Sequence, residues 1–319
     1  VARVLSVALL AAAAGIAHAQ NYPAKSVRFV IGFSPGGPSD ILTRLVGTKL
    51  SEGLGQPFVF DNRPGAGGNI AGEIVAKSPP DGYTILMGNN SILATNAALY
   101  KNMGFDPVKD LDPVALIASQ PNILVVHPSV PVKSVKELIA LAKARPGQLN
   151  YASSGSGAAA HLSAELFKSM TGTQMVHVPY KGAAPALTDV LAGQCQLIFA
   201  TSLSVQPYIK SGRLRALAVT TAKRARANPQ LPTIAEAGVP GFEANTWHGI
   251  VVPAHTPAAV ITRLNSEINR VLQMPEVRER IEGLGGEILG GTPQQFAAYI
   301  RSEIPKWTKV VKESGARAE

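Results

Sequence analysis

The chain has 319 residues, of which 46% are hydrophobic and only 16% are charged, a balance that excludes a disordered protein and leaves room for two modest domains. The formal net charge is +9, but the positive residues are scattered and form no stripe with interleaved aromatic residues. This pattern argues against a nucleic-acid partner. Cys195 is the single cysteine, so no disulfide within this chain stabilises the fold.

The first 19 residues have the pattern of a secretory signal peptide. Arg3 supplies the basic region, residues 4–14 the apolar region, and Ala17-His18-Ala19 a cleavage site of the A-x-A type. No later segment approaches the roughly 18 apolar residues that a membrane-spanning helix needs. We therefore expect an exported, periplasmic protein whose mature part begins near Gln20.

Apolar runs alternate with stretches of helical periodicity in the first part of the mature chain. The predicted strands are 27–33, 57–60, 83–87, 114–118 and 122–127, and the predicted helices are 41–50 and 69–77. Gln120-Pro121 separates the last two predicted strands.

A second series of strands and helices follows, and Ser134 is the expected N-cap of its first helix. The predicted helices are 135–144, 161–170, 185–191 and 205–210, and the predicted strands are 150–152, 175–178, 197–200 and 215–219. A further strand, 246–252, precedes three closing helices, 258–272, 275–284 and 293–314.

This alternation predicts an α/β fold made of two lobes, each a mainly parallel sheet flanked by helices. The break near residues 119–122 and the polar stretch 223–232 are the natural crossings between the lobes. Residues 20–120 and 229–319 are expected to form the first lobe, and residues 121–228 the second. Two crossings between two lobes predict a hinge and a cleft that opens and closes.

Two glycine-rich loops stand where a predicted strand passes into a predicted helix. The first glycine loop is Phe33–Asp40 and the second is Ser153–Gly157. Such loops aim free backbone N–H groups, and the positive end of a helix dipole, at one place. The pair suggests two walls of a single anion-binding cleft.

Ligands of open α/β sheets lie beyond the carboxyl ends of the strands, so the residues that follow the strands are further candidates. Small hydroxyls, amides and glycines dominate there, with no nucleophile–base pair, metal-ligand spacing or cofactor fingerprint. The candidate ligand-binding residues are Phe33, Gly36, Gly37, Pro38, Ser39, Asp40, Asn90, Ser91, Ser154, Gly155, Ser156, Gly157, His161, Tyr180, Lys181, Gly182, Thr201 and Trp247.

Several of these candidates also have a structural interpretation. Asp40 is a better helix cap than a partner for an anion, and His161 either contacts the ligand or supports its loop. Trp247-His248 forms a flat wall or simply part of the core, and Lys181 is either a cationic contact or an exposed lysine. The glycine-rich stretch 62–68 either borders the cleft or forms a structural loop, and we favour the structural loop.

A set of short motifs, in this order, resembles the substrate-binding receptors of tripartite tricarboxylate transporters, the Bug or TctC-type receptors, over essentially the whole mature chain. The motifs are Tyr22-Pro23, Pro35-Gly36-Gly37 with Asp40 and Arg44, Asp61-Asn62-Arg63-Pro64-Gly65-Ala66-Gly67-Gly68, Pro80-Asp81-Gly82-Tyr83-Thr84, Ser154-Gly155-Ser156-Gly157 with His161, Pro179-Tyr180-Lys181-Gly182, Leu214-Arg215-Ala216-Leu217-Ala218-Val219 and Pro232-Thr233 with Glu236-Ala237-Gly238.

The resemblance implies a periplasmic binding protein with a Venus-flytrap motion that holds a small organic carboxylate between the two glycine loops and hands it to membrane permease subunits. It implies no enzyme activity, cofactor or metal, and we expect a monomer. Ala200-Thr201 stands where the family often has an acidic residue, which favours a plain carboxylate over an amino acid. Two alternatives stay open: docking on a sensor kinase and, with less support, a secreted enzyme.

Overall fold

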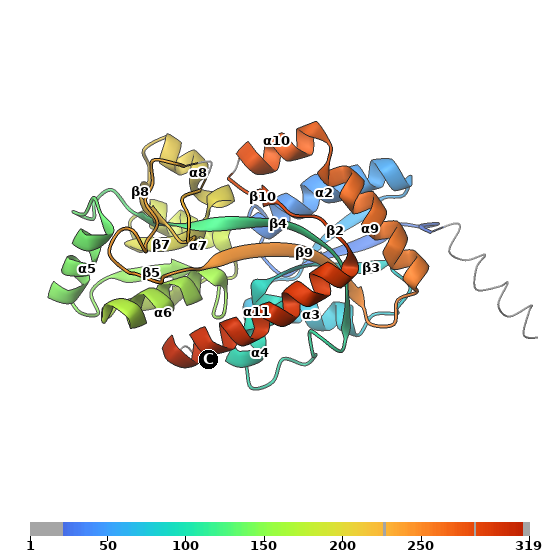
Figure 1. Ribbon diagram of the computed structural model, residues 1–319, viewed down its shortest axis with the longest axis horizontal. Coiled ribbons are helices and arrows are strands. Elements are labelled where there is room, and N and C mark those ends of the chain that lie inside the picture. The colour runs from blue at the N-terminus through green and yellow to red at the C-terminus, as the bar shows by residue number, and fades with distance from the viewer. Residues whose placement is uncertain (1–21, 226–227, 284, 315–319) are drawn as a thin grey trace, which may run out of the picture.

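The computed structural model describes residues 22–225, 228–283 and 285–314, so the predicted signal peptide lies outside the described residues. Two lobes lie side by side and give the molecule an elongated outline (Figure 1). The sheet path runs β2-β1-β3-β9-β4-β7-β5-β6, and β8 and β10 pair with β4 beside it. No helix in this part of the chain combines the length and apolar character that crossing a bilayer requires.

The first lobe contains a parallel unit, because β1 pairs in parallel with both β2 and β3. Helices α2 and α9 pack against each other over its strands. The elements of this lobe are β1 (Val27–Ile31), α2 (Pro38–Leu54), β2 (Phe58–Asn62), a 3-10 turn (Ala66–Gly68), α3 (Asn69–Ala76), β3 (Thr84–Asn89), a π-helical segment (Ser91–Thr95), α4 (Asn96–Leu99), α9 (Ala258–Leu272), α10 (Pro275–Gly283) and β10 (Glu287–Ile288).

The second lobe repeats this design, since β5 pairs in parallel with both β6 and β7. Ser134 caps α5 as predicted, with its Oγ accepting a hydrogen bond from the Glu137 N–H. The elements of this lobe are α5 (Val135–Ala144), β5 (Asn150–Ser153), α6 (Ala159–Thr171), β6 (Val176–Pro179), α7 (Ala183–Leu191), β7 (Leu197–Thr201), α8 (Ser202–Lys210) and β8 (Arg215–Val219).

Two long strands, β4 (Leu111–Val126) and β9 (Asn245–Pro253), run between the lobes (Figure 1). Every described pair that involves either strand is antiparallel, a feature that the predicted alternation did not indicate. The prediction of separate strands at 114–118 and 122–127 is wrong, because β4 continues through Gln120-Pro121. Pro121 stands opposite Asn245, and from Asn122 onward β4 pairs with β7. A proline is tolerated where the strand changes partners.

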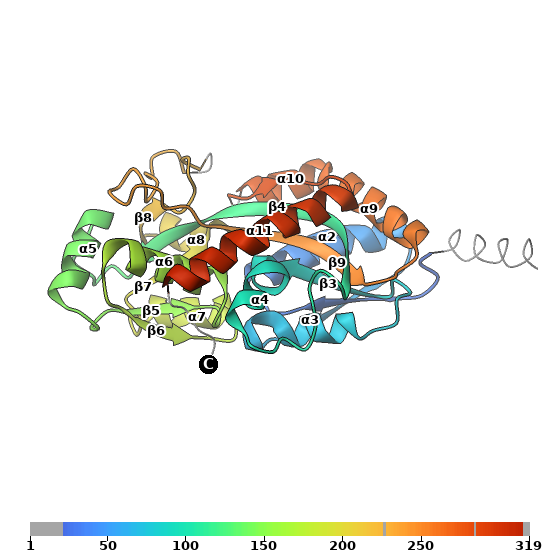
Figure 2. The ribbon, with the colours of Figure 1, turned by 60° about the horizontal axis from the view of Figure 1, so that its bottom comes forward.

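Helix α11 (Pro293–Ser314) lies across both lobes (Figure 2). It packs against α4 of the first lobe, α6 of the second and the crossing strand β4. Glu303 on this helix accepts hydrogen bonds from the indole N–H groups of Trp247 and Trp307, each at 2.8 Å. The helix therefore adds a third connection between the lobes beside the two strands.

Candidate functional site

A cavity lies between the lobes at the carboxyl ends of β1, β3, β5 and β7, where each strand passes into a helical segment. The space between its lining atoms, with the open solvent at its mouth included, is about 510 Å³. We call it the inner cavity, and it is lined by Phe33, Pro38, Ser39, Asn89, Asn90, Ser91, Asn122, Ser154, Ala158, Ala159, Ala160, Ala183, Ile198, Phe199, Ala200, Thr201, Thr246 and His248.

The first turns of two long helices, one from each lobe, form opposing parts of this wall. Ser39 belongs to the first turn of α2, and Ala159 and Ala160 to the first turn of α6. Their backbone N–H groups have no hydrogen-bond partner among the described residues, as expected at a helix start. Both helix dipoles place their positive ends here, so the cavity offers an anion neutral donors from two sides.

Several polar side chains in this wall lack protein partners. Asn90 is completely buried, and neither its Oδ1 nor its Nδ2 is hydrogen-bonded within the described chain. The Ser91 hydroxyl is in the same condition. Because an unpaired buried polar atom costs about 1–3 kcal/mol, these groups call for a ligand or water. No Lys, Arg, Asp or Glu occurs among the described residues that line the inner cavity.

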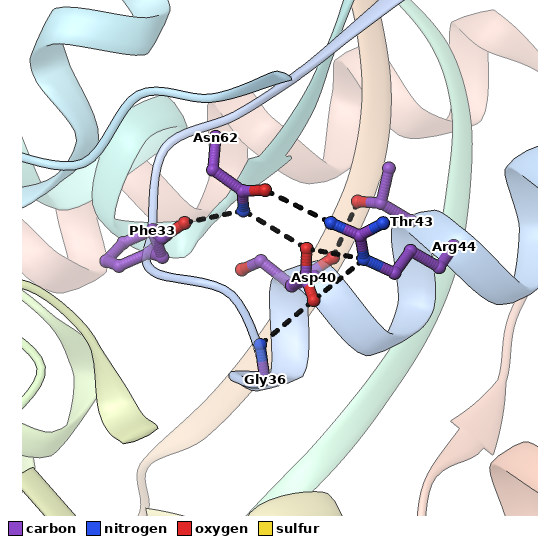
Figure 3. Close-up of polar contacts among 7 residues, drawn as sticks. Phe33, Gly36, Asp40, Thr43, Arg44 and Asn62 are labelled. Carbon is purple, nitrogen blue, oxygen red and sulfur yellow. Dashed lines mark hydrogen bonds and ion pairs between the residues drawn. The ribbon is translucent and has the colours of Figure 1, made fainter. Parts of the chain in front are cut away.

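The first glycine loop is braced by the Asp40 carboxylate (Figure 3). It accepts hydrogen bonds from the Gly36 N–H at 2.9 Å, from the Arg44 guanidinium at 2.9 Å and from the Asn62 amide at 3.1 Å. Burial alone would raise the pKa of Asp40, but these hydrogen bonds and the charge of Arg44 hold the pKa below its ordinary value. Asp40 therefore holds the loop in shape, and it is not among the residues that line the inner cavity.

The second glycine loop is braced by a neutral aromatic stack. The Gly157 N–H donates to His161 Nδ1 at 3.1 Å, and the His161 ring stacks on His177 with centroids 4.1 Å apart. His177 in turn stacks on Tyr151 and contacts the Ser153 hydroxyl at 2.6 Å. Burial, aided by the charge of nearby Lys168, lowers the pKa of His161 to about 4, so the ring stays neutral near pH 7.

These braces correct one expectation about the loops. The N–H groups of Gly36 and Gly157 have acceptors inside the protein, and Gly155 N–H lies 3.2 Å from the Ser153 hydroxyl. The predicted donation of these glycine N–H groups to a ligand does not hold in this structure. Among the described residues, unpaired N–H groups remain at Ser39 in the first loop, at Ser156 in the second, and in the first turn of α6 at Ala159 and Ala160.

A second hollow, the outer cleft, adjoins the inner cavity and shares Phe33 and Ser154 with it. The lobes touch beside it: Ser34 Oγ donates to the carbonyl of Lys181, and the Tyr100 hydroxyl donates to the carbonyl of Ser156 at 3.2 Å. The outer cleft is lined by Gly32, Phe33, Gly65, Ala66, Gly67, Gly68, Tyr100, Ser154, Gly155, Ser156, Pro179, Tyr180 and Lys181. These contacts describe a closed arrangement of the lobes.

The structure brings most of the predicted site residues to these two hollows. Those that line the inner cavity are Phe33, Pro38, Ser39, Asn90, Ser91, Ser154 and Thr201. Those that line only the outer cleft are Gly155, Ser156, Tyr180 and Lys181. Those that line neither hollow but shape the loops or their contacts are Gly36, Gly37, Asp40, Gly157, His161 and Gly182.

Trp247 is the exception among the candidates. Its side chain is completely buried and packs edge-on against Phe296 and Tyr299 of α11. Because successive side chains of a strand point to opposite faces, the neighbouring His248 lines the inner cavity instead. We therefore correct the assignment of Trp247 from ligand contact to core.

The prediction missed Asn122 and Thr246 as lining residues, and it considered His248 only together with Trp247, as a flat wall or part of the core. They stand within the crossing strands β4 and β9, where no turn or glycine marks a site in the sequence. For the loop around Gly67 the structural interpretation was favoured over a border of the cleft, yet Gly65–Gly68 line the outer cleft. A side chain at Gly67 would meet the Ser156 carbonyl at 2.6 Å, so this loop forms part of the contact between the lobes.

Known proteins resemble this chain over nearly its whole length. The model of the tripartite tricarboxylate transporter family receptor matches residues 42–316. The protein BugT of Bordetella pertussis is 38% identical over 315 residues, which cover 98% of this chain and 97% of BugT.

Two solved structures have the same fold. The Rhodopseudomonas palustris protein Rpa4515, solved with adipate, is 44% identical with a TM-score of 0.91, and the match covers 93% of this chain and 100% of that one. MatC from the same organism, solved with bound malate, is 31% identical with a TM-score of 0.88 over 91% of this chain and 100% of MatC. The chain thus belongs to the tripartite tricarboxylate transporter family of receptors, the TctC or Bug-type substrate-binding receptors.

Proposed function

We propose that this protein is a periplasmic solute receptor that binds a small organic carboxylate in the inner cavity and delivers it to the membrane subunits of a tripartite tricarboxylate-type transporter. The observation that carries the proposal is the pair of helix starts, α2 and α6, whose unpaired N–H groups line one cavity from both lobes. Hydrogen bonds from such donors to a carboxylate contribute roughly 1.5–3 kcal/mol each.

The chemistry of the ligand follows from the wall. No acidic side chain among the described lining residues is available to pair with an ammonium group, which favours a plain carboxylate over an amino acid. The relatives solved with adipate and with malate hold dicarboxylates, which supports the same class of ligand. The completely buried Asn90 and Ser91 are placed to bind the second polar end of such a molecule.

The division into lobes is also part of the proposal. Phe242 packs against Phe167 and Phe199 of the second lobe, and the Ala244 N–H bonds to the Thr220 carbonyl. We therefore move the segment 229–244 from the first lobe, where it was expected, to the second. The lobes are then linked by β4 near Gln120 and by β9 from Asn245 onward, with α11 lying across both.

Closure supplies the signal for delivery. The direct contacts between the lobes run from Ser34 to Lys181 and from Tyr100 to Ser156, and a movement that opens the cleft would separate them. A membrane partner that recognises this surface distinguishes the loaded receptor from the empty one. We infer a binding role instead of catalysis, in line with a family of substrate-binding receptors.

Calorimetric titration of the purified protein against dicarboxylates, tricarboxylates and aromatic acids tests the proposal. Binding of at least one class is expected, and the absence of measurable binding to all three classes would contradict the proposed function. Ala159→Pro sharpens the test, because proline at the first helical position removes one N–H and is tolerated there. The preceding residue, Ala158, has the extended backbone that a following proline requires (φ −64°, ψ 155°).

The matched control is Ala258→Pro at the first position of α9, where Pro257 has a similar backbone (φ −53°, ψ 134°) and neither residue lines the inner cavity or the outer cleft. We expect Ala159→Pro to weaken binding roughly 10- to 100-fold, the loss of one charge-assisted hydrogen bond, and Ala258→Pro to leave affinity unchanged. Equal affinities for the two variants would place the carboxylate elsewhere.

A further inference from the structure

Three buried side chains form a hydrogen-bonded chain that ends in the inner cavity. Ser39 Oγ of α2 lies 3.0 Å from Nε2 of His248 on β9, and His248 Nδ1 lies 3.2 Å from Nε2 of Gln120 on β4. All three residues are at most 3% exposed. The chain therefore joins a ligand-facing hydroxyl to both strands that cross between the lobes.

The polarity of this chain follows from the amide at its far end. Because the amide nitrogen of Gln120 only donates, His248 Nδ1 accepts, and a neutral imidazole then carries its hydrogen on Nε2. In the structure, the Oε1 atom of Gln120 has no hydrogen-bond partner among the described residues. If the amide were rotated by 180°, its NH₂ group would take that buried position, and both of its hydrogens would be unpaired there. Burial lowers the pKa of His248 to about 3, so the ring is neutral at physiological pH.

These atoms have the arrangement of a serine nucleophile and a histidine base, but the hydrogen lies on the wrong side for that chemistry. A base needs the lone pair of Nε2 to take the serine hydrogen. Here Nε2–H donates to Ser39 Oγ, and the Ser39 hydroxyl hydrogen has no other acceptor in the described part of the chain. That hydrogen is free to point into the cavity, beside the unpaired Ser39 N–H.

We propose that His248, held as its Nε2–H tautomer by Gln120, is a positioning residue that commits the Ser39 hydroxyl to donate to the ligand. The inference rests on the proposed function and narrows its ligand class. The atom facing Ser39 must accept a hydrogen bond, as a carboxylate or carbonyl oxygen does, and an ammonium group, which has no lone pair, is rejected there.

Nitrogen NMR of the uniformly ¹⁵N-labelled, ligand-free protein between pH 6 and 8 reads the tautomer directly. The His248 signal is assigned by its loss in His248→Gln. We expect a protonated Nε2 and an unprotonated Nδ1 throughout this range, and a mixture of tautomers in Gln120→Leu. A protonated Nδ1 in the wild-type protein overturns the inference, whatever the protein binds.

Calorimetric titration with adipate as the probe measures how much the Ser39 hydroxyl and His248 contribute to ligand affinity. Ser39→Ala and His248→Phe are each expected to weaken binding roughly 10- to 100-fold, with little further loss in the double variant, because His248 acts through Ser39. His248→Gln, which can place an amide N–H at the position of Nε2, is expected to restore most of the affinity and covers the case in which His248→Phe fails to fold.

The outcomes separate the two proposals. A wild-type protein that binds neither adipate nor any other acid of the panel contradicts the proposed function itself. Wild-type binding that Ser39→Ala leaves unchanged overturns only the role of Ser39. Hydrolysis of p-nitrophenyl acetate that disappears in Ser39→Ala would also overturn the inference, since it requires Nε2 to accept the serine hydrogen.

Discussion

The two glycine loops look alike in sequence but are stabilised by different chemistry. In the first lobe a charged carboxylate, Asp40, gathers the Gly36 N–H, Arg44 and Asn62. In the second lobe a neutral ring, His161, accepts the Gly157 N–H and stacks on His177. Each brace uses up a glycine N–H and leaves the first turn of the following helix to face the cavity. The same local motif can therefore be held by opposite electrostatics.

One glycine of each loop, Gly157 and Gly37, differs in the room it has for a side chain, and this predicts the largest effect. A Cβ at Gly157 would lie 2.5 Å from Asn96 Oδ1 and 2.6 Å from Leu99 Cδ2, and Gly157 has φ +81°. We expect Gly157→Ala to weaken ligand binding about 100-fold, because it combines left-handed strain with a clash on closure.

Gly37→Ala is the matched control in the other loop. A Cβ there would have its nearest neighbour at 3.5 Å, an ordinary contact, and its φ is negative. Its affinity, measured by calorimetry, is expected to stay within about threefold of wild type, the range of a neutral surface change. Equal losses in the two variants would show that the loops do not differ in this respect.

Removal of the Asp40 carboxylate is expected to give the next largest effect, a loss of stability. Asp40→Asn is expected to lower the free energy of unfolding by roughly 1.5–3 kcal/mol through weaker hydrogen bonds to Arg44 and Gly36. Since the folded-state pKa of Asp40 lies below its unfolded value, its stabilisation is complete above about pH 4 and is lost as pH falls further. Denaturant unfolding at pH 7 and pH 3 measures both effects.

Glu282→Gln is the control for this variant, because Glu282 pairs with Arg278 on an exposed helix face. Exposed ion pairs contribute little, so no more than about 1 kcal/mol is expected. A loss in Asp40→Asn that is no greater than in Glu282→Gln would contradict the role of the carboxylate as a brace.

The neutral brace responds to pH in a different window. The pKa of His161 is lowered by burial to about 4, so the unfolded chain takes up its proton first, near pH 6.5. The stabilisation that neutral His161 gives the folded state is therefore complete above that pH. It declines as pH falls toward 4, and the free energy of unfolding drops by on the order of 1–2 kcal/mol between pH 7 and pH 5.

Two substitutions at His161 separate hydrogen bonding from titration. His161→Asn can keep an acceptor near the Gly157 N–H and is expected to flatten the decline in the free energy of unfolding between pH 7 and pH 5. His161→Leu leaves that N–H unpaired and is expected to cost about 1–3 kcal/mol at pH 7. Identical pH profiles in wild type and His161→Asn would remove His161 from this role.

The smallest effect on binding is expected at Trp247. Trp247→Phe loses the hydrogen bond to Glu303 and is expected to cost roughly 1–3 kcal/mol of stability. Its affinity for the ligand should not change, because the side chain packs on α11 instead of lining the cavity. A selective loss of affinity with unchanged melting temperature would return Trp247 to the binding site.

The sequence predicted the fold well wherever the signal was local. The strand–helix pairs around the two loops appear with boundaries shifted by a few residues: α6 begins at Ala159 instead of His161, for example. β4 was split in two because Pro121 is a local break signal, whereas its pairing with β9 and β7 depends on residues far along the chain. The π-helical segment 91–95 contains no glycine or proline, so the sequence gives no local signal for it.

The site residues, like the fold, could be predicted only where a local sequence signal marks them. Ser39, Asn90 and Thr201 follow strands, so the rule for strand ends found them. Asn122 and Thr246 could not be found in this way, because they face the cavity from within crossing strands. Which N–H groups remain free depends on where Asp40 and His161 place their side chains, and only the folded chain shows this.

A crystal structure with the tightest-binding acid of the panel tests the central claim most directly. The expected result is a carboxylate in the inner cavity, within hydrogen-bond distance of the N–H groups of Ser39 in one lobe and of Ala159 or Ala160 in the other. A carboxylate bound beside Lys181 in the outer cleft, with the inner cavity empty, would contradict the claim that the two helix starts hold the ligand.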